Sequence, residues 1–427
     1  MSTVETTKDA VYKKIAWRLM PVLFLGYTFA YLDRVNIGFA KLGMQEELWF
    51  NDEVFAMASG IFFIGYFLFE VPGNILMHKV GARFWITRIM LTWGIISGLC
   101  AIASSAKMFY WIRFLLGVAE AGFYPAIILY LTYWFPQKRR ATIFAMFLLA
   151  INFAGIVGSP ISGIILESTK NLGYLKPWQW LFMIESIPSI ALGLLVPFLL
   201  TNKPDHAKWL TPEEKALVKK DMEDDEEEGR KHAIGEANFF EIFKSTKIWL
   251  FASAYFCIVI GIYGISFWLP QIIENTMTND KLEIGLIATI PWLLSAIAMV
   301  VIGRNADKSA NYKQYVIITC FISMIGFLGS GLHNTNAFFV MTMISIAAIG
   351  SMSAVAVFWS LPTTILSGTA AAAGIAFVNS IGALGGFISP EMFVWFKTNF
   401  DLGVGLLAAG VIMGIAGTIL LLMPKKR

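Results

Sequence analysis

Repeated apolar runs, each about 20 residues long, constrain the fold of this chain more than any other feature. An α-helix rises about 1.5 Å per residue, so each run is long enough to cross a hydrocarbon core about 30 Å thick. The 427 residues are 57% hydrophobic and 15% charged, whereas a soluble domain carries roughly 25% charge. Runs such as 248–271 and 404–423 lack the alternating polarity of transmembrane β-strands. The sequence therefore predicts an all-α membrane protein.

The apolar runs form two groups of six, which predicts twelve transmembrane helices in two six-helix bundles. The N-terminal bundle is expected at 1–201, the C-terminal bundle at 247–427, and a cytoplasmic linker at 202–246. The predicted spans are 15–40, 54–77, 84–105, 108–135, 140–167, 179–201, 247–275, 284–304, 314–332, 338–361, 370–396 and 401–423. In the linker, Thr211-Pro212-Glu213-Glu214 has the pattern of a helix start. We interpret this segment as a short solvated helix, and a regulatory docking site is the alternative.

Loop charge predicts the orientation of the chain. Basic residues occupy the N-terminal flank of the first span and every second loop after it, as at 79–88, 138–140 and 304–313, while the loops between them carry acidic residues. By the positive-inside rule, the basic loops and both termini face the cytoplasm. We expect a multi-pass protein of a bacterial cytoplasmic (inner) membrane, without a cleaved signal peptide. The net charge of +4 follows from these loops and gives no hint of nucleic-acid binding.

Six ionisable residues lie inside predicted spans: Asp33, Arg34, Glu70, Arg113, Glu120 and Glu185. Each such residue costs roughly 3 kcal/mol or more in a membrane, so those that occur usually line a pathway or pair with one another. Glu120 is the clearest case, because it lies near the predicted bilayer midplane. Desolvation there favours the protonated acid, as a proton-coupling site requires. For Glu70 and Glu185 a structural role is favoured.

A polar stripe runs along the predicted fourth span. Arg113 precedes Glu120 by two helical turns, and Gly117 and Tyr124 continue the stripe. We expect all four residues to face one cavity, where the geometry allows an ion pair between Arg113 and Glu120. Both are therefore candidates for proton coupling. The alternative is a buried salt bridge that only fixes the fourth span.

The first span combines a candidate anion ligand with a second candidate proton carrier. Arg34 shares a helix face with Tyr27 and Tyr31, while Asp33 is turned about 100° away toward a neighbouring helix. The guanidinium remains charged and binds carboxylates bidentately, whereas Asp33 can gain and lose a proton. The alternative is an interhelical ion pair near the outer surface.

The second half offers neutral groups instead of charges. Trp359 in the predicted tenth span and Asn379 in the eleventh can stack on and hydrogen-bond to the uncharged part of a substrate. For each residue taken alone, packing is the competing interpretation.

Several motifs resemble the anion:cation symporter branch of the major facilitator superfamily, and the match runs nearly from end to end. They are 31–40 (YLDRVNIGFA), 80–83 (VGAR), 113–123 (RFLLGVAEAGF), 134–136 (WFP), 358–362 (FWSLP), 366–370 (LSGTA) and 374–379 (GIAFVN). Within that branch the chain resembles bacterial permeases for rhamnonate, tartrate, phthalate and 4-hydroxyphenylacetate.

The resemblance implies a major facilitator fold that works by alternating access around a central cavity. It implies that Asp33 and Glu120 carry protons, that Arg34 binds the substrate carboxylate and that Arg113 lies beside the proton site. It also implies that the cavity is lined by Tyr31, Tyr66, Asn152, Trp359 and Asn379. Two departures from the family pattern stand out. His78 replaces an aspartate of the gating loop, and Asn152 replaces a glutamine found in some sugar-acid permeases.

These features predict a proton-coupled symporter that takes up a small organic carboxylate, such as a sugar acid, a hydroxy-dicarboxylate or an aromatic acid. A carboxylate uniporter or exchanger, or a transporter-like sensor without net flux, is the alternative. An enzyme is not expected, because the four histidines are scattered in loops and at span ends. The three cysteines lie in apolar runs without metal-ligand spacing. We expect no cofactor other than the coupling proton, and a monomer in the lipid bilayer.

Overall fold

The computed structural model describes residues 2–232, 245–309, 311–332, 336–361 and 368–423, in which every regular element is a helix. Twelve helical segments of this part are long and apolar enough to cross a membrane, which confirms the predicted fold class. The helices of the first half are α1 (Ser2–Val35), α2 (Ile37–Met44), α3 (Asp52–Val80), α4 (Ala82–Leu99), α5 (Ala106–Glu120), α6 (Phe123–Thr132), α7 (Gln137–Ser168) and α8 (Pro177–Leu199). They are followed by α9 (Pro212–His232), α11 (Thr246–Thr276), α12 (Lys281–Ser309), α13 (Tyr312–Gly331), α14 (Ala337–Phe358), α16 (Gly368–Asn399) and α17 (Leu402–Leu422).

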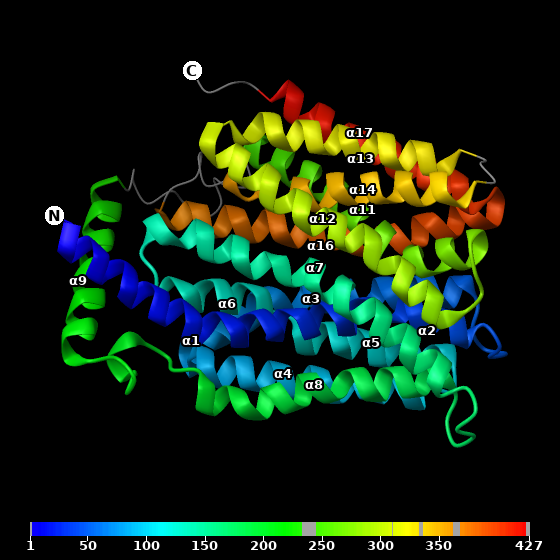
Figure 1. The fold of residues 1–427 in the computed structure, drawn as a ribbon, viewed down its shortest axis with the longest axis horizontal. Helices are drawn as coiled ribbons and strands as arrows, with labels where there is room; N and C mark the ends of the chain where they lie inside the picture. The colour runs from blue at the N-terminus through cyan, green and yellow to red at the C-terminus, as the bar shows by residue number, and fades with distance from the viewer. Residues whose placement is uncertain (1, 233–244, 310, 333–335, 362–367, 424–427) are drawn as a thin grey trace.

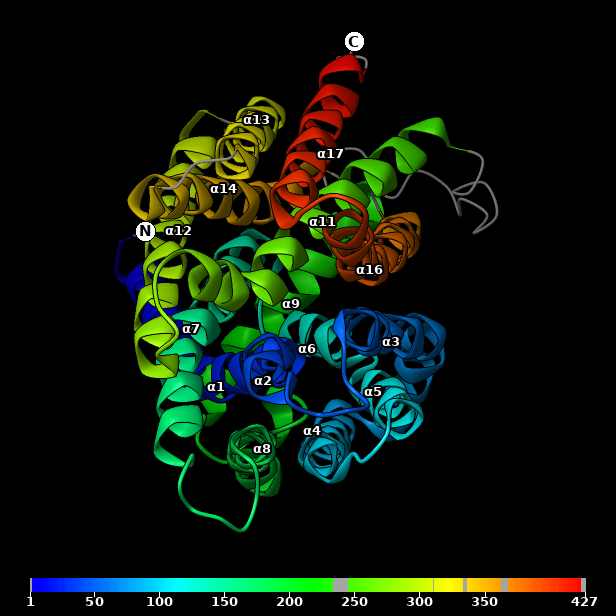
Figure 2. The ribbon, with the colours of Figure 1, turned by 90° about the vertical axis from the view of Figure 1, so that its right-hand side faces the viewer.

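The long helices run roughly parallel and form two groups (Figures 1 and 2). One group contains α1 to α8 and the other contains α11 to α17. The groups meet where α3 packs on α16, where α7 packs on α12 and where α2 packs on α11. The predicted domain boundaries fall close to the end of α8 and the start of α11.

The predicted fourth span is not one continuous helix. It ends as α5 at Glu120 and begins again as α6 at Phe123. Between them, Gly122 adopts a φ of 83°, a left-handed conformation that glycine tolerates without a Cβ clash. Pro125 lies in the first turn of α6, where its missing N–H costs no helical hydrogen bond. The local sequence thus breaks the span directly after the buried Glu120.

Helix α9 packs across one end of the bundle, which we call the linker end. It lies beside the N-terminus of α1 in Figure 1. Ion pairs among the described residues hold it to the first half: Lys8 with Asp221, Lys14 with Glu214 at 2.7 Å, and Arg140 with Asp225 at 3.4 Å. The hydrogen bond from the Lys14 ammonium lowers the pKa of Glu214. Helix α9, in the predicted linker, is therefore docked against the bundle, and the alternative of a regulatory docking site stays a prediction.

The opposite end of the bundle, which we call the far end, joins the two halves through both charge and close backbone packing. Asp52 at the start of α3 pairs with Lys41 at 2.7 Å and with Lys397 of α16 at 2.6 Å. Nearby, Gly163 of α7 lies against the backbone of Lys281 and Gly285 in α12. This close approach needs residues without bulky side chains.

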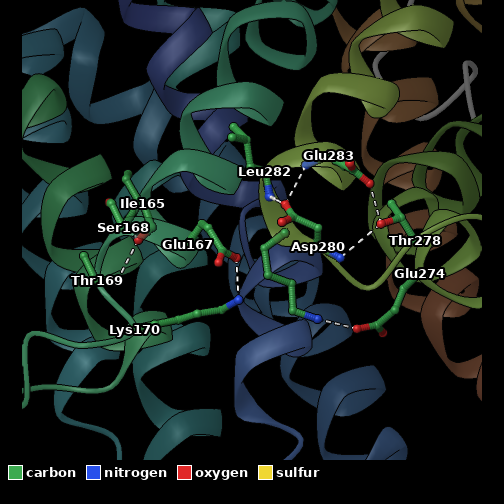
Figure 3. A network of polar contacts seen from close by, with 11 residues as sticks. Ile165, Glu167, Ser168, Thr169, Lys170, Glu274, Thr278, Asp280, Leu282 and Glu283 are labelled. Atoms are coloured by element: carbon green, nitrogen blue, oxygen red, sulfur yellow. Dashed lines mark hydrogen bonds and ion pairs between the residues drawn. The ribbon is translucent and has the colours of Figure 1, made fainter.

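The connection between α11 and α12 is capped locally at this end (Figure 3). Asp280 accepts hydrogen bonds from the backbone nitrogens of Leu282 and Glu283, at 2.8 and 3.0 Å, so it satisfies free N–H groups at the start of α12. Lys281 pairs with Glu274, and Glu167 at the end of α7 pairs with Lys170 at 2.5 Å.

Candidate functional site

A buried ion pair between Arg34 and Glu120 forms the centre of the candidate site. The Arg34 Nη2 donates to Glu120 Oε1, while Nη1 donates to the hydroxyl of Tyr263 at 2.6 Å. Because Tyr263 belongs to α11, the guanidinium connects the first half of the chain to the second. The side chains of Arg34 and Glu120 are 10% and 2% exposed. The break after Glu120 leaves its carboxylate at the very end of α5, directed toward α1.

Aromatic rings cover the guanidinium. The Arg34 Cζ lies 5.1 Å from the ring centroid of Phe62 and 5.5 Å from that of Tyr66. Such cation–π contacts favour a charged group that has lost its water. Tyr66, expected to line the cavity, therefore lies beside the predicted anion ligand.

Arg113 does not pair with Glu120 in the described part of the chain, which differs from the expected stripe. Its guanidinium donates to the backbone carbonyls of Ala58 at 3.2 Å and Arg34 at 3.1 Å. Helical side chains tilt toward the N-terminus of their helix, so Arg113 reaches away from Glu120. Arg113 instead ties α5 to the backbones of α1 and α3.

The other two residues of the expected stripe, Gly117 and Tyr124, do not face a common cavity either. Gly117 faces the backbone carbonyl of Phe62, so it serves close packing of α5 on α3. Tyr124 lies on α6, beyond the helix break, and its ring contacts Tyr27 and Phe147. The helical spacing that predicted one common face ends at the break.

Asp33 points away from Arg34, as its position on the helix predicted. It accepts hydrogen bonds from Trp93 Nε1 at 3.0 Å, Ser97 Oγ at 2.8 Å and Ser189 Oγ at 2.7 Å. These donors come from α4 and α8 and are all neutral. Asp33 is therefore a buried carboxyl group inside the first half, held by hydroxyl and indole groups rather than by a cation.

Two further predicted residues reach from the first half into the second. The hydroxyl of Tyr31 lies 2.8 Å from Ser266 Oγ on α11. The amide nitrogen of Asn152 donates to Ser295 Oγ on α12 at 2.7 Å. Both residues thus sit at the boundary between the halves, together with Arg34.

Trp359 and Asn379 lie in the second half, as expected, but Asn379 has an unexpected partner. The Trp359 ring centroid is 4.8 Å from that of Tyr255. Asn379 Nδ2 donates to Glu70 Oε1 at 2.6 Å, and Ser380 Oγ donates to Glu70 Oε2 at 3.1 Å. Glu70, for which a structural role was favoured, therefore bridges α3 and α16.

Three polar residues of α11 that contact the site residues were not predicted, because they carry no charge: Tyr255, Tyr263 and Ser266. A weaker signal was present, since Tyr255, Tyr263 and Ser266 are polar groups within one apolar run. The side chain of His78 and the segment 362–367 lie outside the described residues. In the described part, no three His, Cys, Asp or Glu residues gather as a metal site.

Comparisons with known proteins agree with this architecture. The family model of the Major Facilitator Superfamily matches residues 23–390. A candidate tartrate transporter of Agrobacterium vitis is 44% identical, over 91% of this chain and 85% of its own length. The inner membrane transport protein RhmT of Escherichia coli K12 is 36% identical, over 95% of this chain and 94% of its own.

The solved structure of the xylose transporter XylE from E. coli, in a partially occluded inward open conformation, is similar in fold alone. Its TM-score is 0.77 at 15% identity, and the match covers 96% of this chain and 99% of that one. These matches confirm the resemblance drawn from the motifs and the predicted fold. The chain belongs to the Major Facilitator Superfamily and is a multi-pass membrane transporter, not an enzyme.

Proposed function

We propose that this transporter imports a small organic carboxylate together with protons, by alternating access of a site between its two halves. The observation that carries the proposal is the buried ion pair of Arg34 and Glu120 at that boundary. An anionic partner stabilises the buried guanidinium of Arg34, because breaking a buried ion pair leaves a charge that is costly. A substrate carboxylate is an anion of the same chemistry as Glu120. Substrate and Glu120 are therefore alternative partners for Arg34.

Proton coupling follows from this competition. Protonation of Glu120 removes its charge and releases Arg34, whose planar fork then binds the substrate carboxylate bidentately. After the substrate leaves, Glu120 loses its proton and pairs with Arg34 again. Arg34 thus has one anionic partner in each state: the substrate carboxylate in the loaded carrier and Glu120 in the empty carrier.

Asp33 is the second candidate proton carrier. The hydroxyls of Ser97 and Ser189 donate to the ionised carboxylate and can accept a hydrogen bond from the protonated acid. Both charge states of Asp33 therefore have hydrogen-bond partners.

Neutral groups around the ion pair are suited to the uncharged body of a substrate. Tyr66 lies beside the ion pair, and Tyr31 and Asn152 contact the second half, in which Trp359 and Asn379 lie. The name of the Agrobacterium relative supports a hydroxy-dicarboxylate such as tartrate, and sugar acids share its hydroxyl and carboxylate chemistry.

The proposed location is the cytoplasmic (inner) membrane, which the name of the E. coli relative supports. The basic loops of the sequence support a cytoplasmic position for the linker end and both termini. The far end then faces outward. We propose that the chain acts as a monomer, since both halves of the site come from one polypeptide.

Purified protein in proteoliposomes tests the function. Labelled tartrate, a sugar acid and an aromatic acid are offered with and without an imposed inward proton gradient. A symporter concentrates at least one of them only when the gradient is present. Gradient-independent equilibration would indicate a uniporter, countertransport alone would indicate an exchanger, and binding without flux would indicate a sensor.

A further inference from the structure

Glu185 is a buried carboxyl group that the proposed cycle does not yet use. It lies on α8, is 2% exposed, and accepts a hydrogen bond of 2.5 Å from Ser162 Oγ on α7. Its second oxygen, Oε2, is buried without a hydrogen-bond partner among the described residues. Leaving a buried carboxylate oxygen unsatisfied is costly, so a purely structural glutamate should have both oxygens paired.

Asn36, at the junction of α1 and α2, has unsatisfied polar atoms in the same region. It is 1% exposed, and it lies close enough to Glu185 to interact with it. Yet neither its amide nitrogen nor its amide oxygen makes a hydrogen bond of good geometry within the described part of the chain. Asn36 and Glu185 therefore interact with each other without a well-formed hydrogen bond, so each can gain a hydrogen bond from a bound water molecule.

A cavity of about 20 Å³ lies next to these groups, enough for about one water molecule. Its polar lining includes Asn36, Ser159, Ser162 and Ser266. Because Ser266 belongs to α11 and the others to the first half, the cavity lies between the two halves. A water there can donate to Ser162, whose own hydroxyl donates to Glu185.

Glu185 is also connected toward the proposed proton site. Ser189 follows it by one helical turn on α8 and donates to Asp33 at 2.7 Å. Asp33 also acts electrostatically on Glu185. Hydrogen bonds thus join Ser162, which lines the cavity, to Glu185, and join Ser189 to Asp33, while Glu185 and Ser189 lie one helical turn apart.

We propose that Glu185 is a proton-relay residue that carries protons between a water in this cavity and Asp33. The inference rests on the proposed symport function. A proton from the far-end solvent enters the cavity when the halves separate and converts Glu185 to the neutral acid. The proton then passes through the Ser189 hydroxyl to Asp33, and Glu185 returns to the carboxylate. Glu185 therefore has the same charge after each transfer as before it.

The first test compares Glu185→Gln with wild-type protein in proteoliposomes. Glutamine keeps the shape and the hydrogen bond to Ser162 but cannot transfer a proton. We expect gradient-driven uptake to fall by about a hundredfold, as for the loss of a positioned proton-transfer group. Counterflow between equal substrate pools, which needs no net proton transfer, should stay near the wild-type rate. Glu167→Gln, at the end of α7, is the matched control and should leave both rates unchanged.

Wild-type gradient-driven uptake in Glu185→Gln would overturn the relay and leave the symport function intact. Absence of gradient-driven uptake in wild-type protein would overturn the proposed function, and the relay with it. Equal loss of uptake and counterflow in Glu185→Gln would indicate a structural role and also overturn the relay. Glu185→Asp, which retains an ionisable group, should restore part of the gradient-driven rate if the relay is correct.

A second measurement does not depend on the substrate. Infrared difference spectra between acidic and alkaline buffer report protonated carboxyl groups in the reconstituted protein. We expect Glu185→Gln to lose one carboxyl band and to slow protonation of the band that Asp33→Asn removes. Unchanged bands and rates in Glu185→Gln would contradict the relay even if the variant were inactive in transport.

Discussion

Arg34 of α1 forms a buried ion pair with Glu120, the last residue of α5, and it simultaneously donates to Tyr263 of α11. The chain breaks at Gly122, immediately after this carboxylate. The charged centre of the molecule thus lies where a span is interrupted and where the two halves meet. A change of partner at Arg34 therefore affects both the charge balance and the contact between the halves.

Arg34→Lys should abolish or severely weaken substrate binding. A lysine keeps the charge but lacks the planar guanidinium group, whose two terminal nitrogens donate to Glu120 and Tyr263. Loss of one charge-assisted hydrogen bond costs about 2 kcal/mol, or roughly thirtyfold in affinity. Calorimetry measures the affinity, and Arg18→Lys on the exposed face of α1 is the control. Wild-type affinity in Arg34→Lys would mean that Arg34 serves only a structural ion pair.

Alanine at Trp359 or at Asn379 should change selectivity among carboxylates. Trp359 offers an aromatic face, and Asn379 offers an amide that now bonds to Glu70. Loss of either group alters the contacts available to the uncharged part of a substrate. Competition of unlabelled acids against labelled substrate measures the ranking. If both variants keep the wild-type ranking, these residues take no part in recognition.

The helical architecture was predictable because length and hydropathy alone decide which segments can span a bilayer. Predicted spans such as 54–77 and 284–304 lie within α3 and α12. The break between α5 and α6 was not predicted, since hydropathy contains no information about backbone conformation. Gly122 and Pro125 were its signals, and both are compatible with a continuous apolar run.

The sequence predicted which charged residues form the candidate site, but not which of them form an ion pair. The free-energy cost of an ionisable residue inside a membrane span identified Arg34, Asp33 and Glu120 as candidates. Helical spacing suggested Arg113 as the partner of Glu120, because spacing along one helix is visible in a sequence. The observed partner, Arg34, comes from another helix, and contacts between helices depend on packing that one sequence does not reveal.

Asp52→Asn should weaken the closure of the far end. Asp52 bridges Lys41 of the first half and Lys397 of the second, and Lys41 also lies 3.9 Å from the ring centroid of Trp268. Asparagine removes the countercharge that pairs directly with the buried Lys41. The closed state should lose about 1 to 2 kcal/mol, less than for a fully buried pair because Asp52 is 31% exposed.

Spin labels at Leu48 and Phe400, two exposed positions at the far end, measure this opening. The distance distribution should shift toward longer separations in Asp52→Asn. Asp280→Asn, which changes charge at the far end without touching this bridge, serves as the control. An unchanged distribution in Asp52→Asn would show that backbone packing alone closes this end.

Gly122→Ala should destabilise the protein by about 1 to 2 kcal/mol, because an alanine is strained at a φ of 83°. The midpoint of thermal unfolding in detergent measures the effect. Gly303→Ala is a matched control, since a Cβ at Gly303 meets no atom within 4 Å. Equal midpoints for the two variants would contradict a conformational requirement at Gly122.

Glu120→Gln should uncouple transport from the proton gradient. Glutamine resembles the protonated acid in shape and hydrogen bonding but cannot release a proton. Arg34 then has no internal anion and remains available to the substrate, so binding should persist or tighten. The loaded carrier can still move between its two states, and counterflow between equal substrate pools should continue.

The step that fails in Glu120→Gln is the return of the empty carrier. In the wild type, the ionised Glu120 supplies the countercharge for Arg34 once the substrate has left. The variant leaves Arg34 buried and unpaired at this stage, which costs several kcal/mol. Accumulation driven by an imposed pH gradient should therefore disappear, while Glu46→Gln, an exposed change, should behave as wild type. Concentrative uptake at the wild-type rate in Glu120→Gln would exclude Glu120 as a coupling site and leave Asp33 as the carboxylate to test.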